Sequence, residues 1–202
     1  MKAIICVFSS LAFIACSRAH AADELGRWQE GVAGGLLVAE STSPDGGFAL
    51  FEINAYDIGQ PTTATAIAVA DSQRIKLLGL IDSITQHSTD KPHKSFLTIK
   101  WSPDSHYLAT HDSTPKHSVL HLYRITASAF RALPFPDLRH AAAARLNIPE
   151  QSIGSSGQMP IHWLHPNQLL VRVRLSMNHA SRQIDLVISI SQDETIAIRP
   201  DP

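Results

Sequence analysis

Histidine and aspartate side chains gather in the middle of this sequence, where their types and spacing are compatible with metal binding. The chain has 11 histidines, and His111 and His117 flank a short loop, with Asp112 beside the first of them. If the segments on either side of this loop are paired strands, the three side chains can meet, and neutral imidazole and carboxylate groups are ordinary zinc ligands. His111, Asp112 and His117 therefore form a candidate metal site. The alternative is a set of exposed strand and loop histidines.

Two other groups of residues invite comparison with catalytic motifs. Gly154-Ser155-Ser156-Gly157 resembles the Gly-x-Ser-x-Gly nucleophile elbow, but it is one residue too short and follows a helix instead of joining a strand to one. A flexible linker is the preferred interpretation. Asp45 and Asp104 occupy the same position in two repeated turns, where the usual role of a carboxylate is to accept hydrogen bonds from turn amides. We therefore assign no catalytic residue and no cofactor.

The composition is that of a globular protein. The chain has 202 residues, 44% of them hydrophobic, with 17 Lys and Arg against 18 Asp and Glu. This length can bury a core without metal or disulfide staples. A net charge of -1 gives no electrostatic reason to expect a nucleic acid as the partner. After the first residues no apolar run approaches the roughly 20 residues of a membrane-spanning helix, so no transmembrane segment is expected in the mature chain.

The N-terminal residues predict export. Lys2 is followed by an uncharged apolar stretch over residues 3–15, and Ala19-His20-Ala21 has the small-x-small form that signal peptidase accepts. We expect a signal peptide over residues 1–21 and a domain over residues 22–202, in the periplasm or secreted. As an alternative, Phe13-Ile14-Ala15-Cys16 resembles a bacterial lipobox, which would attach a lipid anchor at Cys16 and make an outer-membrane lipoprotein.

A strand pattern occurs three times along the chain. Each copy has an apolar segment that runs into a Pro-Asp or Pro-Asn turn and leaves it as a second apolar segment, which is typical of a tight hairpin. The copies are Thr42–Leu50, Trp101–Ala109 and the degenerate Trp163–Val171. Further short strand candidates follow each hairpin. The sequence therefore predicts an all-β fold of three four-stranded antiparallel units, at about residues 36–80, 96–133 and 159–198.

The hairpin Trp101-Ser102-Pro103-Asp104-Ser105-His106-Tyr107-Leu108-Ala109 resembles the blade signature of TolB-like and WD40-like β-propellers. Ser105 replaces the usual glycine, which the first copy retains as Gly46. The resemblance implies blade-like units, a partial β-propeller, and no particular activity. Because a closed propeller has roughly four to eight blades, three units leave open flanks. The sequence leaves open whether the chain is an open wedge, pairs with a second copy or docks on another protein.

Three further features belong to this architecture. Strong helix formers over residues 137–147, with Asp137 as N-cap and Pro149 beyond the end, predict one short helix inserted between the second and third units. Trp101 and Trp163 occupy similar places at the ends of first strands, which favours packing between sheets over ligand stacking. Arg172 and Arg174 share one strand face, as a solvated surface or a contact for an acidic partner.

These observations favour a non-enzymatic protein-interaction module of the bacterial envelope. No catalytic constellation is present, and the incomplete propeller leaves surface for a partner, either another envelope protein or a second copy of the chain. The alternative is a metal-dependent or small-ligand-binding periplasmic protein, with His111, Asp112 and His117 as its metal ligands or as part of an active site.

Overall fold

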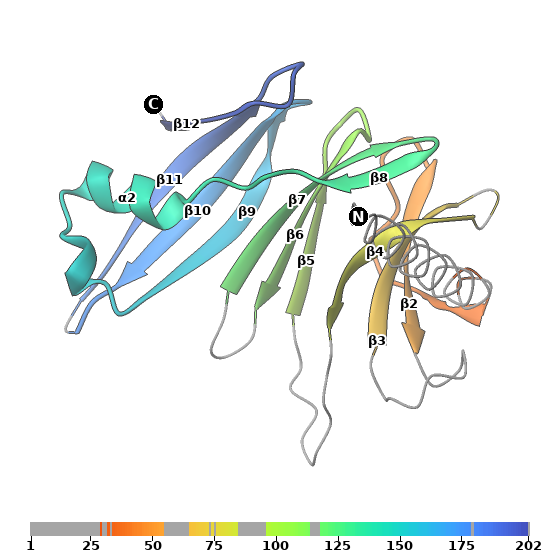
Figure 1. Cartoon of the computed structure of the whole chain (residues 1–202), viewed down its shortest axis with the longest axis horizontal. Helices are drawn as coiled ribbons and strands as arrows, with labels where there is room; N and C mark the ends of the chain where they lie inside the picture. The colour runs from red at the N-terminus through yellow and green to blue at the C-terminus, as the bar shows by residue number, and fades with distance from the viewer. Residues whose placement is uncertain are drawn as a thin grey trace, which may run out of the picture.

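The computed structural model describes residues 29, 32, 34–54, 65–72, 74, 76–84, 96–113, 118–178 and 180–201. The predicted signal peptide, residues 1–21, and Cys16 within it lie outside the described residues. The described part of the chain forms three antiparallel four-stranded sheets and a short helix, so the predicted all-β class with an inserted helix is confirmed. Figure 1 shows the three sheets side by side, coloured orange to yellow, green and blue in chain order. Among these residues, no helix is long and apolar enough to cross a membrane.

Each sheet is a simple meander in which consecutive strands pair with one another. The first sheet consists of β1 (Leu36–Leu37), β2 (Phe48–Asn54), β3 (Thr65–Asp71) and β4 (Lys76–Ile84). The second sheet consists of β5 (Phe96–Trp101), β6 (Tyr107–Ser113), β7 (Ser118–Thr126) and β8 (Ala129–Ala132). The third sheet consists of β9 (Ser155–His165), β10 (Gln168–Ser176), β11 (Ser181–Ile190) and β12 (Ile196–Pro200).

The inserted helix α2 (Leu138–Leu146) connects β8 to β9, and a single 3-10 turn (Glu150–Ser152) follows it. Its N-cap is Asp137, as predicted, and the carboxylate accepts a hydrogen bond from the His140 N–H at 3.0 Å. Asn147 ends the helix in the left-handed conformation, with φ of 52°. The helix packs against β10 and β11 and buries Leu138, Ala142 and Ala143.

Most of the core lies in the two interfaces between neighbouring sheets. Leu50, Val69 and Ile81 of the first sheet pack against second-sheet residues Leu108, Tyr123 and Ile125. The other interface joins Ala109, Leu120 and Leu122 to the apolar face of the third sheet and to α2. On β10 that face consists of alternate residues, Leu169, Val171, Val173 and Leu175, as the two-residue period of a strand requires.

One contact occurs in both interfaces and involves the two tryptophans that the sequence assigns to packing. The Trp101 ring stacks on Phe48 of the first sheet at a centroid distance of 6.2 Å, and its Nε1–H donates to the Ser41 carbonyl at 2.8 Å. One sheet further along, Trp163 stacks on Tyr107 at 5.9 Å and donates to the Lys100 carbonyl at 3.0 Å. We call this pair of interactions the tryptophan contact.

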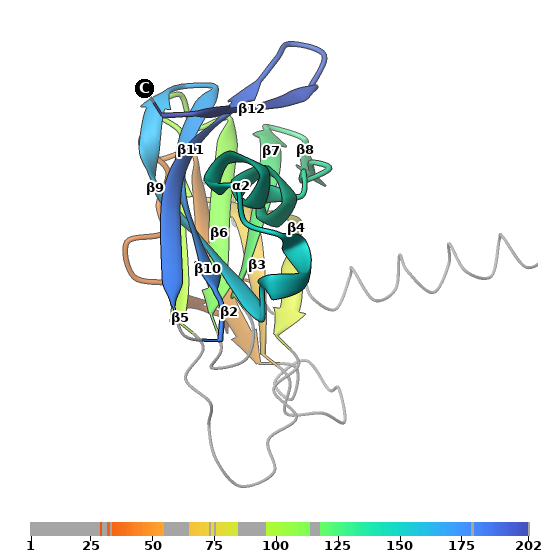
Figure 2. The ribbon, with the colours of Figure 1, turned by 90° about the vertical axis from the view of Figure 1, so that its left-hand side faces the viewer.

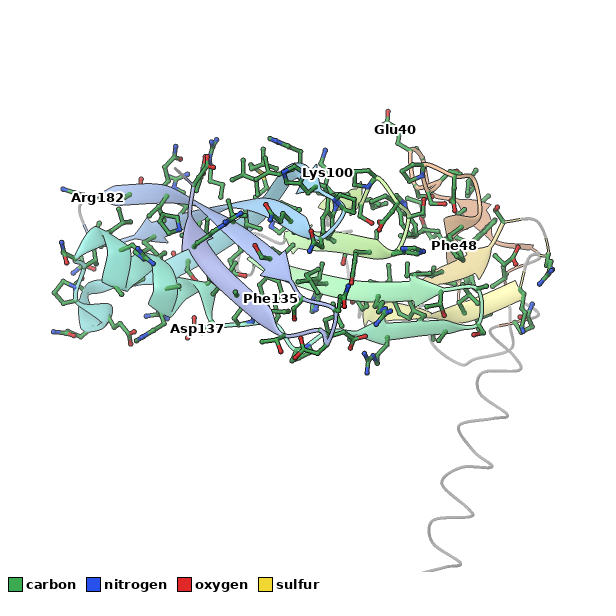
Figure 3. The ribbon with its side chains drawn as sticks, turned by 90° about the horizontal axis from the view of Figure 1, so that it is seen from above. Glu40, Phe48, Lys100, Phe135, Asp137 and Arg182 are labelled. Carbon is green, nitrogen blue, oxygen red and sulfur yellow. The ribbon has the colours of Figure 1, made fainter. Side chains whose placement is uncertain are left out.

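The strands of the three sheets are arranged in the same order across the molecule. Strand β5 contacts β9, and β4 contacts β8. Figure 2 shows β5 and β9 along one margin and β4, β8 and α2 toward the other. In the view from above, Glu40 and Lys100 lie on one side and Phe135 and Asp137 on the other (Figure 3). We call the surface formed by the first strands β1, β5 and β9 the first-strand side.

Candidate functional site

The repeated Pro-Asp turns have the same internal hydrogen bonds. In the first, the Ser43 hydroxyl donates to Asp45 Oδ1 at 2.6 Å and accepts from the Phe48 N–H at 2.9 Å. In the second, the Ser102 hydroxyl donates to Asp104 Oδ1 at 2.6 Å and accepts from the N–H of the tyrosine that begins β6, at 2.9 Å. Both aspartates therefore stabilise the turns of their hairpins, as the sequence predicts.

The same bonds set the charge of the two carboxylates. The Ser43 hydroxyl and the Gly47 N–H lower the pKa of Asp45. Burial raises the pKa of Asp104, but hydrogen bonds from the Ser102 hydroxyl and the His106 N–H outweigh it, so the pKa is lowered there too. Both groups are ionised at neutral pH, which suits a turn-forming acceptor and not a general acid.

The two turns also touch each other. Gly46 has φ of 72°, and Ser105, at the same place in the second turn, has φ of 61°. A side chain in this left-handed region costs about 1 kcal/mol relative to glycine. The Ser105 hydroxyl accepts a hydrogen bond from the Asp45 N–H at 3.2 Å, which links the second sheet to the first. This long-range bond explains why serine stands where the repeat otherwise has glycine.

A pocket of about 220 Å³ lies between the turns of the second and third sheets. Its polar wall includes Asp104, His106, Arg124, Asn167 and Ser191. His106 Nδ1 lies 3.1 Å from Asp104 Oδ2, and the Asn167 amide donates to a carbonyl of β11 at 2.9 Å. The pocket therefore presents groups of both charges to a small polar molecule.

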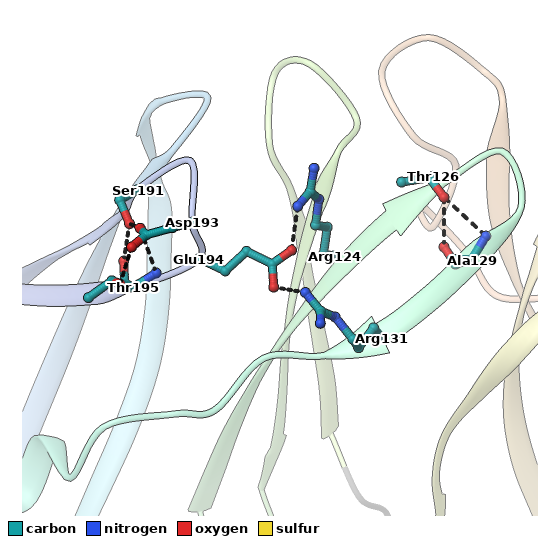
Figure 4. A network of polar contacts seen from close by, with 8 residues as sticks. All are labelled: Arg124, Thr126, Ala129, Arg131, Ser191, Asp193, Glu194 and Thr195. Carbon is teal, nitrogen blue, oxygen red and sulfur yellow. Dashed lines mark hydrogen bonds and ion pairs between the residues drawn. The ribbon is translucent and has the colours of Figure 1, made fainter.

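Arg124 is fixed at the pocket wall by an ion-pair network that joins the second and third sheets (Figure 4). The Glu194 carboxylate, in the turn between β11 and β12, pairs with Arg124 of β7 and Arg131 of β8. Its side chain is only 16% exposed. Glu194 has φ of 65°, so it too adopts the left-handed conformation while contacting the preceding sheet. The sequence analysis did not identify this network, because its partners lie far apart in the chain.

The pocket geometry fits binding better than catalysis. The Ser191 hydroxyl donates to Asp193 and the Thr126 hydroxyl bonds within the β7–β8 turn, so both serve their own hairpins. Arginine stays protonated and cannot act as a base. The His106 imidazole is paired with the turn carboxylate of Asp104. The hydroxyl groups of Ser191 and Thr126 are therefore held by their turns and not by a histidine base.

The predicted metal ligands fall only partly within the described residues. His111 lies on β6, is 7% exposed, and pairs in register with Leu120, on the face that packs against the third sheet. Asp112 follows it on β6, but its side chain lies outside the described part, as does the whole of His117. Among the described residues, no group of three or more histidine, cysteine or acidic side chains has a geometry that could hold a metal ion. The metal site stays a prediction.

The Gly154–Gly157 segment differs from its sequence interpretation. A flexible linker was expected, but β9 begins at Ser155, and Ser155 and Ser156 pair with Ser176 and Leu175 of β10. The Gly154 N–H also donates to the Ser176 carbonyl at 2.9 Å. The linker interpretation is wrong because pairing with β10 overrides the local preference of glycine and serine for loops.

The largest exposed apolar side chains of the described residues lie on the first strands of two sheets. They are Leu36 (72% exposed), Leu37 (57%), Met159 (42%) and Leu164 (38%). The first two form β1 and the last two belong to β9, so all four lie on the first strands of their sheets. Apolar side chains beside sheet edges are typical of surfaces that bind other proteins.

No protein-family model matches this chain, and a search of curated proteins finds no match. The site must therefore be interpreted from its geometry.

Proposed function

We propose that the protein is an exported, non-enzymatic interaction module that binds a partner protein on its first-strand side. The observation that carries this proposal is the confinement of Leu36, Leu37, Met159 and Leu164 to β1 and β9. Each of these strands is the end strand of its sheet, and an end strand presents backbone N–H and C=O groups that no neighbouring strand of the same sheet uses. A partner gains both backbone hydrogen bonds and apolar contacts there.

The register of β9 indicates where a partner strand would pair. From Ser155 to Met159 the strand pairs with β10 residue by residue, without a bulge. Beyond this segment the register shifts twice, and Pro160 has no N–H to donate. Bulges and proline protect edges from added strands. We therefore expect the partner to pair along residues 155–159, with Met159 in the contact.

The wider context of the proposal comes from the sequence. Three consecutive four-stranded meanders with aligned edges support the resemblance to TolB-like and WD40-like propeller blades. The leader over residues 1–21 supports export to the periplasm or the medium, with an outer-membrane lipoprotein anchored at Cys16 as the alternative. The partner is then another envelope protein or a second copy of the chain.

Site-specific photo-cross-linking in the native host tests this proposal. A photoreactive phenylalanine analogue at Met159 is expected to give one dominant adduct, identified by mass spectrometry. The same analogue at Gln183 is the matched control, because Gln183 is also exposed on the third sheet but lies on β11, which β10 separates from β9. An absence of adducts at Met159, or equal adducts at both positions, contradicts the proposal.

The second candidate function is binding of a small polar ligand, which the pocket beside Arg124 favours, or of a metal ion. Stoichiometric zinc or copper in protein purified without a histidine tag would support a metal site at His111, Asp112 and His117. An increase in melting temperature with a small polar compound, lost in Arg124→Ala, would instead support the pocket.

A further inference from the structure

The outer face of the third sheet, on the side away from the second sheet, differs from the faces that pack against a neighbouring sheet. In the second sheet, Trp101 pairs with Leu108, and Tyr107 comes just before Leu108. In the third sheet Trp163 pairs with Leu169, so Gln168 takes the place of Tyr107.

Gln168 cannot receive a tryptophan as Tyr107 does. The aromatic ring that forms half of the tryptophan contact is missing, and the Gln168 side-chain oxygen accepts a hydrogen bond from Arg199 of β12 at 2.9 Å. An amide held by an arginine offers neither the apolar surface nor the stacking geometry of a phenyl ring.

The next residue on the same face of β10 is Leu170, which pairs with Val187, and the two side chains are 7% and 1% exposed. A charged group follows at Arg172. By the same register, Arg172 takes the place of His111. Its guanidinium forms two hydrogen bonds to Asp185 on β11, with Nε–Oδ1 and Nη2–Oδ2 distances of 2.8 and 2.7 Å. These bonds lower the pKa of Asp185, so both partners stay charged. Covering the pair with another sheet would remove its water at a high cost.

The opposite end of the stack is closed in another way. The face of the first sheet that turns away from the second sheet carries Ile53, Ala68 and Leu77, and these pack with Val32, which is only 1% exposed. The Leu77 N–H donates to the Gln29 side-chain oxygen at 2.7 Å. Residues preceding the first sheet thus cover this face.

The first sheet also lacks the donor half of the tryptophan contact. Ser41, whose carbonyl accepts from Trp101, is followed by Thr42, whereas Lys100 and His162 are each followed by a tryptophan. The first sheet therefore has no indole to place against an earlier sheet, just as the third has no ring to receive one.

We propose that the three-sheet stack terminates itself, and that the outer face of the third sheet is a solvent-facing cap that excludes a further blade-like sheet from a second copy. Terminal units of repeat proteins need such polar outer faces. This inference goes beyond the proposed function, because it concerns β10 and β11 and not the first-strand side. If this face is a cap, several copies cannot close into a ring through it, and the open flanks are covered in another way.

Sedimentation analysis of the full exported chain tests the cap. For the wild-type chain this face is expected to contribute nothing to the self-association constant that sedimentation measures. Arg172→Val with Asp185→Val removes the charged pair and is expected to strengthen self-association about tenfold or more, since well-packed apolar groups replace charges. The matched control, His140→Val with Glu150→Val, removes an ion pair between α2 and the 3-10 turn that follows it, whose side chains are 70% and 54% exposed. It is expected to behave as wild type.

Two results would overturn the inference. One is a cap variant that folds, judged by its circular dichroism spectrum, and associates no more than the control. The other is a covalent dimer of the otherwise wild-type chain through the photoreactive probe at Gln183, which decides the question even if the cap variant fails to fold. Met159 pairs in register with Arg172, so the identity of its adduct matters: an adduct to another protein leaves the cap intact, whereas an adduct to a second copy counts against it. Failure of the proposed function is instead read as an absence of adducts at Met159.

Discussion

The tryptophan contact predicts which pairs of side chains are energetically coupled. Trp101 with Phe48, and Trp163 with Tyr107, form stacked pairs at 6.2 and 5.9 Å with interplanar angles of 16° and 26°. Aromatic pairs of this geometry contribute about 0.5–1.5 kcal/mol beyond the area that they bury. Replacing both members of a pair with leucine is therefore expected to cost less than the sum of the single replacements, by about that amount.

Urea unfolding followed by far-ultraviolet circular dichroism measures these energies, because that signal does not depend on tryptophan fluorescence. The control is the crossed pair Phe48 and Trp163, whose members lie in different interfaces and are expected to be additive within about 0.5 kcal/mol. Trp101→Phe and Trp163→Phe add a second measurement. Each keeps a ring, loses the Nε1–H donor, and is expected to cost about 1 kcal/mol from the hydrogen bond. Coupling in the stacked pairs no larger than in the crossed pair would refute the reasoning.

Three more predictions concern the ends of the stack and the turns. Val32→Ala is expected to lower the free energy of unfolding by about 1–2 kcal/mol in urea titrations, because the side chain is buried. A loss no larger than that of Leu36→Ala, at an exposed site, would contradict the packing of Val32 on the first sheet. Glu194→Gln, which weakens both arginine pairs, is expected to cost about 1 kcal/mol at low salt and less at high salt, and a cost independent of salt would contradict an ion-pair origin. The folded pKa of Asp45 lies below its unfolded value of 3.8, so its contribution is complete above 3.8 and is lost as the pH falls through the folded value. The melting temperature of Asp45→Asn should therefore fall less steeply on acidification than that of the wild type. An equally steep fall in both proteins would show that the Asp45 carboxylate and its bond to Ser43 do not contribute to acid unfolding.

The parts of the fold that depend on local interactions could be predicted from the sequence. The hairpins follow from Pro-Asp turns flanked by apolar segments, and the turn bonds of Asp45 and Asp104 involve residues two positions away. The helix could also be predicted, because the Asp137 carboxylate caps it by accepting a hydrogen bond from the N–H of His140, three positions further along the chain. In each of these cases the chemistry that defines the element lies within the element.

The parts that depend on neighbouring sheets could not be predicted. Nothing near Glu194 in the sequence indicates that Arg124 and Arg131 will surround its carboxylate, because 70 residues separate it from Arg124. The start of β9 at Ser155 was missed for the same reason, since pairing with β10 decides it. The exposed position of Met159 likewise follows from the edge location of its strand, which the order of strands in the assembled sheet determines.

The contacts between sheets share one direction along the chain. Ser105 reaches back from the second sheet to the first, and Glu194 reaches back from the third to the second. Both accept a left-handed backbone that costs about 1 kcal/mol relative to glycine, and each offsets it with bonds to the preceding sheet. Among the described residues no sheet precedes the first, and the position equivalent to Ser105 is Gly46, which adopts a left-handed φ of 72° without strain. Thr42 in place of a tryptophan follows the same logic. At these two positions the later repeats thus carry residues that bond to the preceding sheet, and the first repeat does not.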